Sequence, residues 1–341
     1  MFQNELIQTR DVQSCYLCGG MGIDVIKGMP DRLFGVPGIW NYKRCVKCGL
    51  YWLTPWPQDL GQAYINYHTH RSAEDRRALT ISPHSIKKRI AALAFGYPDK
   101  AASKKSAMYR MLALPGPLSD ISGRSVMWLP GKHPGKLLDI GCGSGMFLEQ
   151  MQELGWDAYG VEPDRNAAVI AKQTLAATEK IFAGPLEEAG FNNGQFDAIT
   201  MAHVIEHLPD PVMILKECRR ILQPNGRLVV TTPNVNSLGR KWFKKNWRGW
   251  EPPRHLFLFN AQALEKCALD AGFKNGQAKP HATTAFDIWL SGKKLQKGSS
   301  GKGFKASVFN FQALFFWLFE YSANKILPVG EELVLTAGPN S

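Results

Sequence analysis

The feature that most constrains this chain is a short apolar strand followed at once by a glycine-rich turn and a helix-forming segment. Residues 136–140 read KLLDI, residues 141–145 read GCGSG, and apolar residues recur at helical spacing over 146–151. An open α/β sheet builds cofactor sites in this way, at the carboxyl edge of its strands. The glycines allow the main chain to approach a ligand closely. A dinucleotide-binding turn would need a third glycine at the position of Met146, so this turn is of a different type.

The next predicted strand, residues 155–161, ends in an acidic residue, Glu162. A carboxylate at this strand end can accept two hydrogen bonds from a ribose diol. Its distance from Gly141 is shared with NAD-binding proteins, so the spacing alone does not identify the nucleotide. The alternative interpretation of Glu162 is a neighbour of a helix N-cap on a solvated turn.

Three further segments follow in a fixed order. Residues 194–201 predict a fourth strand, residues 203–211 read HVIEHLPDP, and residues 212–222 have helical spacing. A turn at 224–226 then leads to a fifth strand, 227–234. With the GxGxG turn, these motifs resemble class I S-adenosylmethionine (SAM) dependent methyltransferases, in particular the ubiquinone-type small-molecule enzymes. The resemblance covers roughly residues 134–281 plus a last strand near 331–337.

The resemblance implies an α/β fold: a seven-stranded Rossmann-like sheet with helices on both faces. It implies a SAM-dependent methyltransferase, and it places the methyl donor against a set of residues from four motifs: Asp139, Gly141, Cys142, Gly143, Gly145, Glu162, Pro163, Leu186, Ala202 and His203.

The HVIEH segment has competing interpretations. His203, Glu206 and His207 fit the H-x-x-E-H signature of a zinc protease, which needs both histidines on one helix. Pro209 and Pro211 limit any helix here to about one turn, which argues against that chemistry. In a methyltransferase, His207 or His203 can act as general base, since imidazole titrates near neutrality. A divalent ion held by Glu206 and a histidine is a second option, and a purely structural role for these side chains is a third.

Two C-x2-C-G pairs lie near the N-terminus. Cys15, Cys18, Cys45 and Cys48 can offer four thiolates to one tetrahedral Zn²⁺, which predicts a closed, structural zinc ribbon with a short hairpin between the pairs. An unmetallated or redox-active pair of motifs is the alternative. The other three cysteines, Cys142, Cys218 and Cys267, are isolated and expected to be small buried residues.

The predicted organisation has three parts: a zinc ribbon over residues 1–55, a helical cap or lid over 56–130, and the methyltransferase core over 131–341. Basic segments at 86–93 and 104–114 are expected to form cap helices. A helical insertion is expected at about 282–329, with a mobile Gly/Ser/Lys linker at 293–305 and a Phe-rich segment, 304–326. That segment is interpreted as a buried helix that covers the sheet, while an interfacial or oligomer-forming helix stays open.

A loop that mixes cations and aromatics, residues 240–257, follows the fifth strand. Arg254 and His255 are its candidates for contact with the acceptor, and His255 is a candidate second base. The alternative is a packed loop whose aromatic side chains fill core.

The net charge of +12 favours an anionic partner. The leading hypothesis is O- or C-methylation of a small-molecule acceptor, a sugar or related metabolite, with a nucleotide-linked sugar as one option. The main alternative is a zinc-ribbon ribosomal RNA methyltransferase; a non-catalytic scaffold is a third hypothesis. No signal peptide and no apolar stretch of about 18 residues are recognised, so a cytoplasmic protein is expected. Peripheral membrane contact and the oligomeric state stay open.

Overall fold

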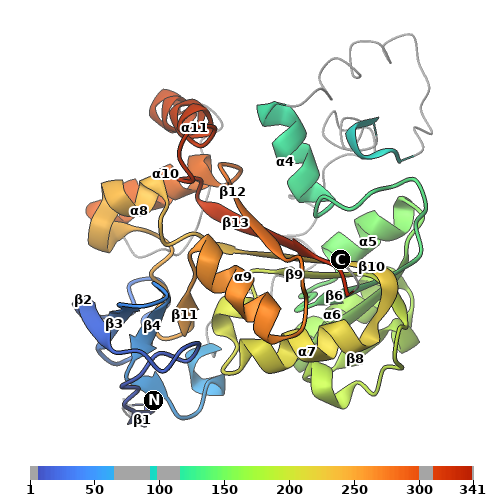
Figure 1. Cartoon of the computed structure of the whole chain (residues 1–341), viewed down its shortest axis with the longest axis horizontal. Coiled ribbons are helices and arrows are strands. Elements are labelled where there is room, and N and C mark those ends of the chain that lie inside the picture. The colour runs from blue at the N-terminus through green and yellow to red at the C-terminus, as the bar shows by residue number, and fades with distance from the viewer. Residues whose placement is uncertain (1–6, 65–92, 98–115, 299–309, 340–341) are drawn as a thin grey trace.

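A computed structural model describes residues 7–64, 93–97, 116–298 and 310–339 (Figure 1). Its centre is a seven-stranded sheet in the order β12-β13-β10-β9-β6-β7-β8. All neighbouring pairs are parallel except those of β13, which runs antiparallel to both β10 and β12. This is the predicted seven-stranded Rossmann-like arrangement. The strands are β6 (Lys136–Ile140), β7 (Asp157–Glu162), β8 (Ile181–Ala183), β9 (Phe196–Ala202), β10 (Leu222–Pro233), β12 (Gln277–His281) and β13 (Glu332–Ala337).

Helices pack on both faces of this sheet. Along β6, Leu137 belongs to a cluster with Met151 of α5 (Met146–Glu153), whereas Leu138 belongs to a cluster with Leu215 of α7 (Pro211–Ile221). Successive side chains of a strand point to opposite faces, so these two helices cover opposite sides. α6 (Arg165–Leu175) packs beside α5, and α9 (Ala261–Asp270) packs beside α7. The helix α4 (Pro117–Ser125) precedes β6.

The N-terminal cysteine motifs belong to a small antiparallel sheet that we call the ribbon. It contains β2 (Gly22–Met29), β3 (Trp40–Cys45) and β4 (Tyr51–Thr54), and β2 and β3 form the hairpin predicted between the cysteine pairs. Its fourth strand, β11 (Phe257–Leu258), comes from the core and pairs with β4. Figure 1 shows this junction, with β11 beside the blue N-terminal strands. The short strands β1 (Thr9–Arg10) and β5 (Trp56–Pro57) pair alongside. The ribbon therefore shares a sheet with the core.

Between β10 and β13 the chain forms α8 (Leu238–Phe243), α10 (Ala285–Gln296) and α11 (Phe311–Ala323), which lie together at one edge of the molecule (Figure 1). Three expectations need correction here. Residues 293–296 continue α10, because this segment packs through Leu295 instead of forming a linker. The sequence also predicts a strand over residues 273–281, whereas β12 begins only at Gln277. The Phe-rich helix is not buried, since five of its large apolar side chains are exposed: Phe311, Leu314, Phe315, Leu318 and Phe319.

The predicted cap helices at 86–93 and 104–114 lie outside the described residues, except for Leu93. The domain boundaries at 55 and 130 stay predictions. Within the part of the chain that the structure describes, no helix is both long and apolar enough to span a bilayer.

Candidate active site

The glycine turn joins β6 to α5 as predicted. Gly141, Gly143 and Gly145 all have positive φ, of 72°, 55° and 80°, a region that side chains with a Cβ rarely adopt. A Cβ at Gly141 would lie 2.5 Å from Cγ2 of Val204, and a Cβ at Gly145 would lie 2.9 Å from Leu175. A Cβ at Gly143 would meet nothing within 4 Å. The first and third glycines are thus needed for packing, and the middle one faces open space that a ligand can fill.

Two buried carboxylates lie near the turn, and one of them, Glu162, bonds to it directly. Glu162, at the end of β7, accepts hydrogen bonds from the backbone N–H of Gly143 (2.8 Å) and of Asp164 (2.9 Å). Burial raises the pKa of Glu162, and these two N–H donors oppose that effect. A carboxylate has lone pairs beyond these two bonds, so Glu162 can still accept from a ligand. Asp139 accepts from Thr200 Oγ1 at 2.7 Å, and burial raises its pKa to about 7.

The other predicted cofactor residues have different exposures around the same edge of the sheet. Cys142 is buried, its Sγ packs toward β7 beside Gly160, and burial raises the pKa of its thiol. Leu186 is buried, whereas Pro163 and Ala202 are exposed at the ends of β7 and β9. Cys218 and Cys267 are fully buried, which confirms the expectation for the isolated cysteines.

The loop after β9 carries the predicted histidine and glutamate side chains. It contains only one turn of helix, η5 (Ile205–His207), as the two prolines predict. Val204 touches Gly141, so this loop lies directly against the glycine turn. The glycine turn and the candidate catalytic residues therefore share one end of the sheet, the carboxyl edge.

His203 is held between two carboxylates. Its Nδ1 lies 3.3 Å from Glu206 Oε1, and its Nε2 lies 2.8 Å from Glu332 Oε1 on β13. Burial disfavours the imidazolium, but the two carboxylates outweigh burial and raise the pKa of His203 to about 9. The backbone of His203 adopts a positive φ of 54°, uncommon for a residue with a Cβ. His203 therefore carries a proton at neutral pH and has both ring nitrogens engaged.

Glu206 and His255 are buried behind this loop. Glu206 accepts from Thr232 Oγ1 at 2.9 Å, and despite burial its histidine neighbours lower its pKa to about 2. His255 has its Nδ1 2.8 Å from the carbonyl oxygen of Gly249, and burial lowers its pKa to about 4. A carbonyl only accepts, so Nδ1 of His255 carries the proton. The free Nε2 then lies 4.0 Å from Glu206.

Glu206, His207 and His255 form a candidate cation site. Each offers one ligand atom, and the three atoms lie within 4.8 Å of one another. Neutral imidazole nitrogens and a carboxylate are suitable ligands for a divalent metal ion. The geometry is compatible with the prediction that Glu206 and a histidine hold a divalent ion.

His207 differs from both neighbours. Its Nδ1 lies 3.0 Å from the carbonyl oxygen of Arg254 and 2.9 Å from the hydroxyl of Tyr64. Because a carbonyl only accepts, this contact assigns the proton to Nδ1 and leaves the lone pair on Nε2. The side chain is half-buried. Of the three histidines, His207 has the tautomer and the exposure that a general base requires.

Arg254 was expected to contact the acceptor, and the structure contradicts this. Its side chain is fully buried and donates to Asp31 from both terminal nitrogens (3.0 Å each), to Glu251 (2.9 Å) and to the carbonyl of Ala63 (3.1 Å). No part of the guanidinium is available to a substrate. The aromatic loop around it is packed likewise: Trp247 and Trp250 are buried.

Several residues that shape the site were not recognised from the sequence: Asp31, Tyr64, Glu251 and Glu332. Asp31 and Arg254 are 223 residues apart, and no local pattern links such positions. Tyr64 stands in a segment whose only signal was a cluster of aromatic residues.

The four N-terminal cysteines converge. Sγ–Sγ distances are 3.5 Å for Cys15–Cys48, 3.4 Å for Cys18–Cys45 and 3.6 Å for Cys18–Cys48. Tetrahedral zinc with Zn–S bonds of 2.3 Å separates sulfurs by about 3.8 Å, so the cluster fits a four-thiolate zinc ribbon. Burial works against the Cys45 thiolate, but the N–H groups of Cys48 and Lys47 lower the pKa of Cys45 to about 7.

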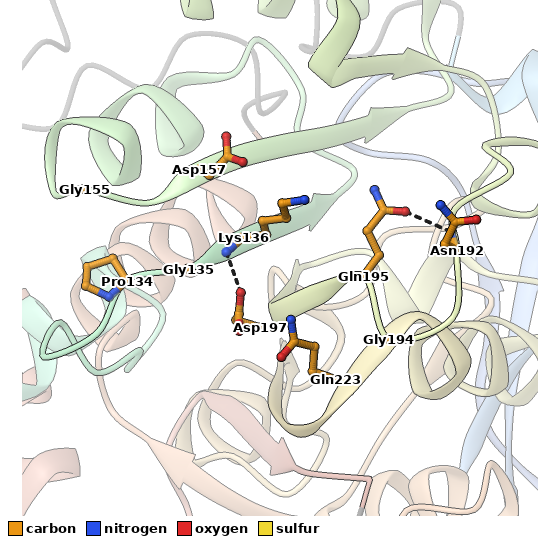
Figure 2. A pocket seen from close by; sticks show the side chains of 10 residues that line it. All are labelled: Pro134, Gly135, Lys136, Gly155, Asp157, Asn192, Gly194, Gln195, Asp197 and Gln223. Carbon is orange, nitrogen blue, oxygen red and sulfur yellow. Dashed lines mark hydrogen bonds between the residues drawn. The ribbon is translucent and has the colours of Figure 1, made fainter.

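A depression of about 510 Å³ lies at the opposite end of the sheet (Figure 2). It is lined by the first residues of β6 and β7, Lys136 and Asp157, and by Asp197 of β9, which accepts from the backbone of Lys136 at 2.7 Å. Open α/β sheets bind cofactors at the carboxyl ends of the strands. This amino-end depression is therefore not the methyl-donor site.

The site and the fold agree with the comparison to known proteins. Residues 118–278 match the family model described as a methyltransferase domain. The ubiquinone biosynthesis O-methyltransferase of Acinetobacter baylyi is 34% identical over 130 residues, which are 35% of this chain and 54% of that protein. The corresponding Thiobacillus denitrificans enzyme is 30% identical over 128 residues, covering 36% and 55%. A SAM-dependent methyltransferase structure from Archaeoglobus fulgidus has a TM-score of 0.44 at 19% identity and covers 65% of this chain and 93% of that one.

The strand order and the glycine turn agree with the match of residues 118–278 to a methyltransferase domain. This domain is joined to a four-cysteine cluster that fits a zinc ribbon, and its curated relatives are ubiquinone-type O-methyltransferases. The chain spans about half the length of the curated relatives it matches.

Proposed function

We propose that this chain transfers the methyl group of SAM to a hydroxyl or a carbon of a small-molecule acceptor, a sugar or related metabolite. The observation that carries the proposal is the contact between the glycine turn and the HVIEH loop, through Gly141 and Val204. It supports the proposal because a donor-binding turn and a general base have to lie at the same end of the sheet. The curated relatives are named as O-methyltransferases of a small molecule, which supports an acceptor of this class.

The chain's own residues would act in two ways. Glu162 and the backbone of the glycine turn would hold the ribose and the amino acid part of SAM, with Leu186 and Ala202 beside them. Bound SAM supplies an electrophilic methyl group. Nε2 of His207 would accept the proton that the acceptor loses as the new bond forms, while its Nδ1 stays bonded to the Arg254 carbonyl. Proximity and alignment of the acceptor supply the rest of the acceleration.

The base is tested with His207→Ala. Turnover should fall by about 10²–10⁴-fold, the usual contribution of a general base, while SAM affinity measured by calorimetry is unchanged. His203→Gln is the comparison, because His203 is expected to hold its proton throughout. Undiminished turnover in His207→Ala removes it as the base, and a larger loss in His203→Gln would transfer the role to that residue.

The donor site is tested with Gly143→Ala, which places a methyl group in the open space of the turn. SAM affinity should fall by at least about tenfold, by the direct steric effect on a close backbone approach. Gly28→Ala is a matched control, because Gly28 has a similar positive φ of 65° and equally open surroundings in the ribbon. Equal SAM affinities in the two variants would refute the assignment.

The acceptor class is tested with labelled SAM and two fractions of cell extract, small metabolites and RNA. Label in the metabolite fraction supports the proposal. Label in RNA supports the alternative, a ribosomal RNA methyltransferase whose ribbon and basic segments bind RNA.

We further propose that the four cysteines bind a structural zinc ion. Cys45→Ser should purify without stoichiometric zinc by atomic absorption, because three thiolates leave the tetrahedral site open. Full zinc content in that variant would contradict the site.

The cation site at Glu206, His207 and His255 predicts a separate effect. Added Mg²⁺ or Mn²⁺ should raise the turnover of zinc-loaded protein, and no response would exclude this site.

A further inference from the structure

The outer face of α11 is an uninterrupted apolar stripe. Phe311, Leu314, Phe315, Leu318 and Phe319 follow the i, i+3, i+4, i+7, i+8 spacing of one helix face, and their exposed fractions are 81, 41, 72, 45 and 53%. Ile326 and Leu327 extend the exposed apolar surface beyond the helix, at 84 and 58%. A soluble monomer rarely exposes a contiguous apolar surface without an occupant.

The helix is fixed to the core by its other face, so the stripe is presented outward. Ala313, Phe316 and Glu320 are buried on that face. Phe316 packs against Trp289 of α10 at a ring distance of 5.0 Å, and Glu320 Oε1 accepts from the backbone of Glu331 at 2.9 Å. Figure 1 shows α11 at the periphery, beyond α10.

The segments that pack with α10 and α11 are rich in cations. The helices that pack around α10 carry Trp242, 57% exposed, which lies 6.5 Å from the Phe316 ring. Among the described residues of α8, η6 (Lys244–Asn246), α10, α11 and the turns that follow α10 and α11, the only exposed carboxylate is Asp287. The same segments carry seven lysines, which we call the lysine rim: Lys241, Lys244, Lys245, Lys293, Lys294, Lys297 and Lys325.

We propose that α11 and its lysine rim bind the surface of an anionic lipid membrane. A stripe of Phe and Leu with an interfacial Trp and flanking lysines is the composition of a helix that lies in the plane of the headgroups. The 13 residues of α11 extend about 20 Å, too short to span a bilayer. A symmetric contact between two copies would bring the two sets of lysines together.

The experiment is cosedimentation of the full chain with sucrose-loaded vesicles, of phosphatidylcholine alone or mixed with phosphatidylglycerol. The protein should bind the phosphatidylglycerol vesicles, and binding should weaken as salt is raised. F315D/F319D should reduce this binding by at least about tenfold, since both side chains would insert between lipids. Both side chains are exposed, so the thermal unfolding of this variant should match that of the wild type.

Two controls define the surface. Leu269→Asp changes an apolar side chain on α9 that is 59% exposed, and it should leave vesicle binding within about twofold. K241E/K244E/K297E should weaken binding to phosphatidylglycerol vesicles and flatten the salt dependence. Absence of wild-type binding, or equal binding by F315D/F319D, overturns the proposal. A wild-type dimer that F315D/F319D converts to a monomer in sedimentation velocity also overturns it, in favour of self-association.

Discussion

Two networks of charged residues flank the HVIEH loop, and they differ in burial and in what they do to a histidine. The ribbon-side network consists of Asp31, Arg254 and Glu251, all fully or almost fully buried. The sheet-side network consists of Glu206, His203, Glu332 and Arg124, and the side chains of His203 and Arg124 keep 37 and 41% exposure.

The two networks act on different atoms. The sheet-side carboxylates contact the His203 ring directly and keep a proton on it. The ribbon-side network fixes the Arg254 side chain, and the carbonyl of the same residue then orients His207. The comparison teaches that one loop holds two histidines in different ways, because two carboxylates contact the ring of His203 and an uncharged carbonyl contacts Nδ1 of His207. The ribbon contributes Asp31 to this arrangement, so it supports the HVIEH loop through Arg254.

The largest expected effect is from Arg254→Ala. It leaves the Asp31 and Glu251 carboxylates buried without their cation, which should cost about 3–5 kcal/mol of the free energy of unfolding. Urea denaturation measures it. Lys266→Ala is the control for a surface pair, because Lys266 pairs with Asp270 on the exposed side of α9, and it should cost less than about 1 kcal/mol. Equal losses in the two variants would show that the ribbon-side network is no stronger than a surface pair.

Asp31→Asn should have a smaller effect on stability and a specific effect on turnover. It keeps the shape of the side chain but removes the negative charge that Arg254 contacts. The free energy of unfolding should fall by about 1.5–3 kcal/mol, the usual contribution of a hydrogen bond to a charged group. Arg254 would then lose its fixed position, and kcat should fall while SAM affinity and zinc content stay unchanged. A fall in SAM affinity equal to that in kcat would mean that Asp31 supports the whole domain and not His207.

How much of this the sequence could predict depends on how local the signal is. The glycine turn, Glu162 and the four cysteines were predictable because their chemistry needs fixed spacing within short segments. The positions of His203 and His207 were predictable, but their difference was not, because Glu332 and the Arg254 carbonyl come from distant parts of the chain. Arg254 was misassigned for the same reason: an arginine in an aromatic loop resembles an acceptor contact until its partner Asp31 is known. For α11 the sequence left a buried and an interfacial helix as alternatives, because the spacing of Phe residues does not say which side is covered.

The sheet-side network predicts a pH dependence of stability. The pKa of His203 is raised from 6.5 to about 9, so its contribution is fully present below pH 6.5 and is lost as the pH rises through 9. Glu206 has its pKa lowered from 4.5 to about 2, so its contribution is lost only as the pH falls below 4.5 toward 2. The His203 side chain is 37% exposed, so solvent screens its ion pairs. We therefore expect the free energy of unfolding to fall by about 1 kcal/mol as the pH rises through this range. His203→Gln should abolish the loss of stability between pH 6.5 and 9. If thermal unfolding of this variant still shows the same loss over that pH range, the contacts of His203 with Glu206 and Glu332 are not its cause.

The smallest effect is expected from Tyr64→Phe. The Tyr64 hydroxyl is the second contact of His207 Nδ1, at 2.9 Å, and the Arg254 carbonyl remains when it is removed. Loss of one of two hydrogen bonds to an oriented ring should cost about 0.5–1.5 kcal/mol, or roughly two- to tenfold in kcat. The proton should stay on Nδ1, so the pH at which kcat is half-maximal should shift little. A large shift of that pH would mean that the tyrosine, and not the Arg254 carbonyl, sets the tautomer of His207, and the ribbon-side network would then lose its role in the reaction.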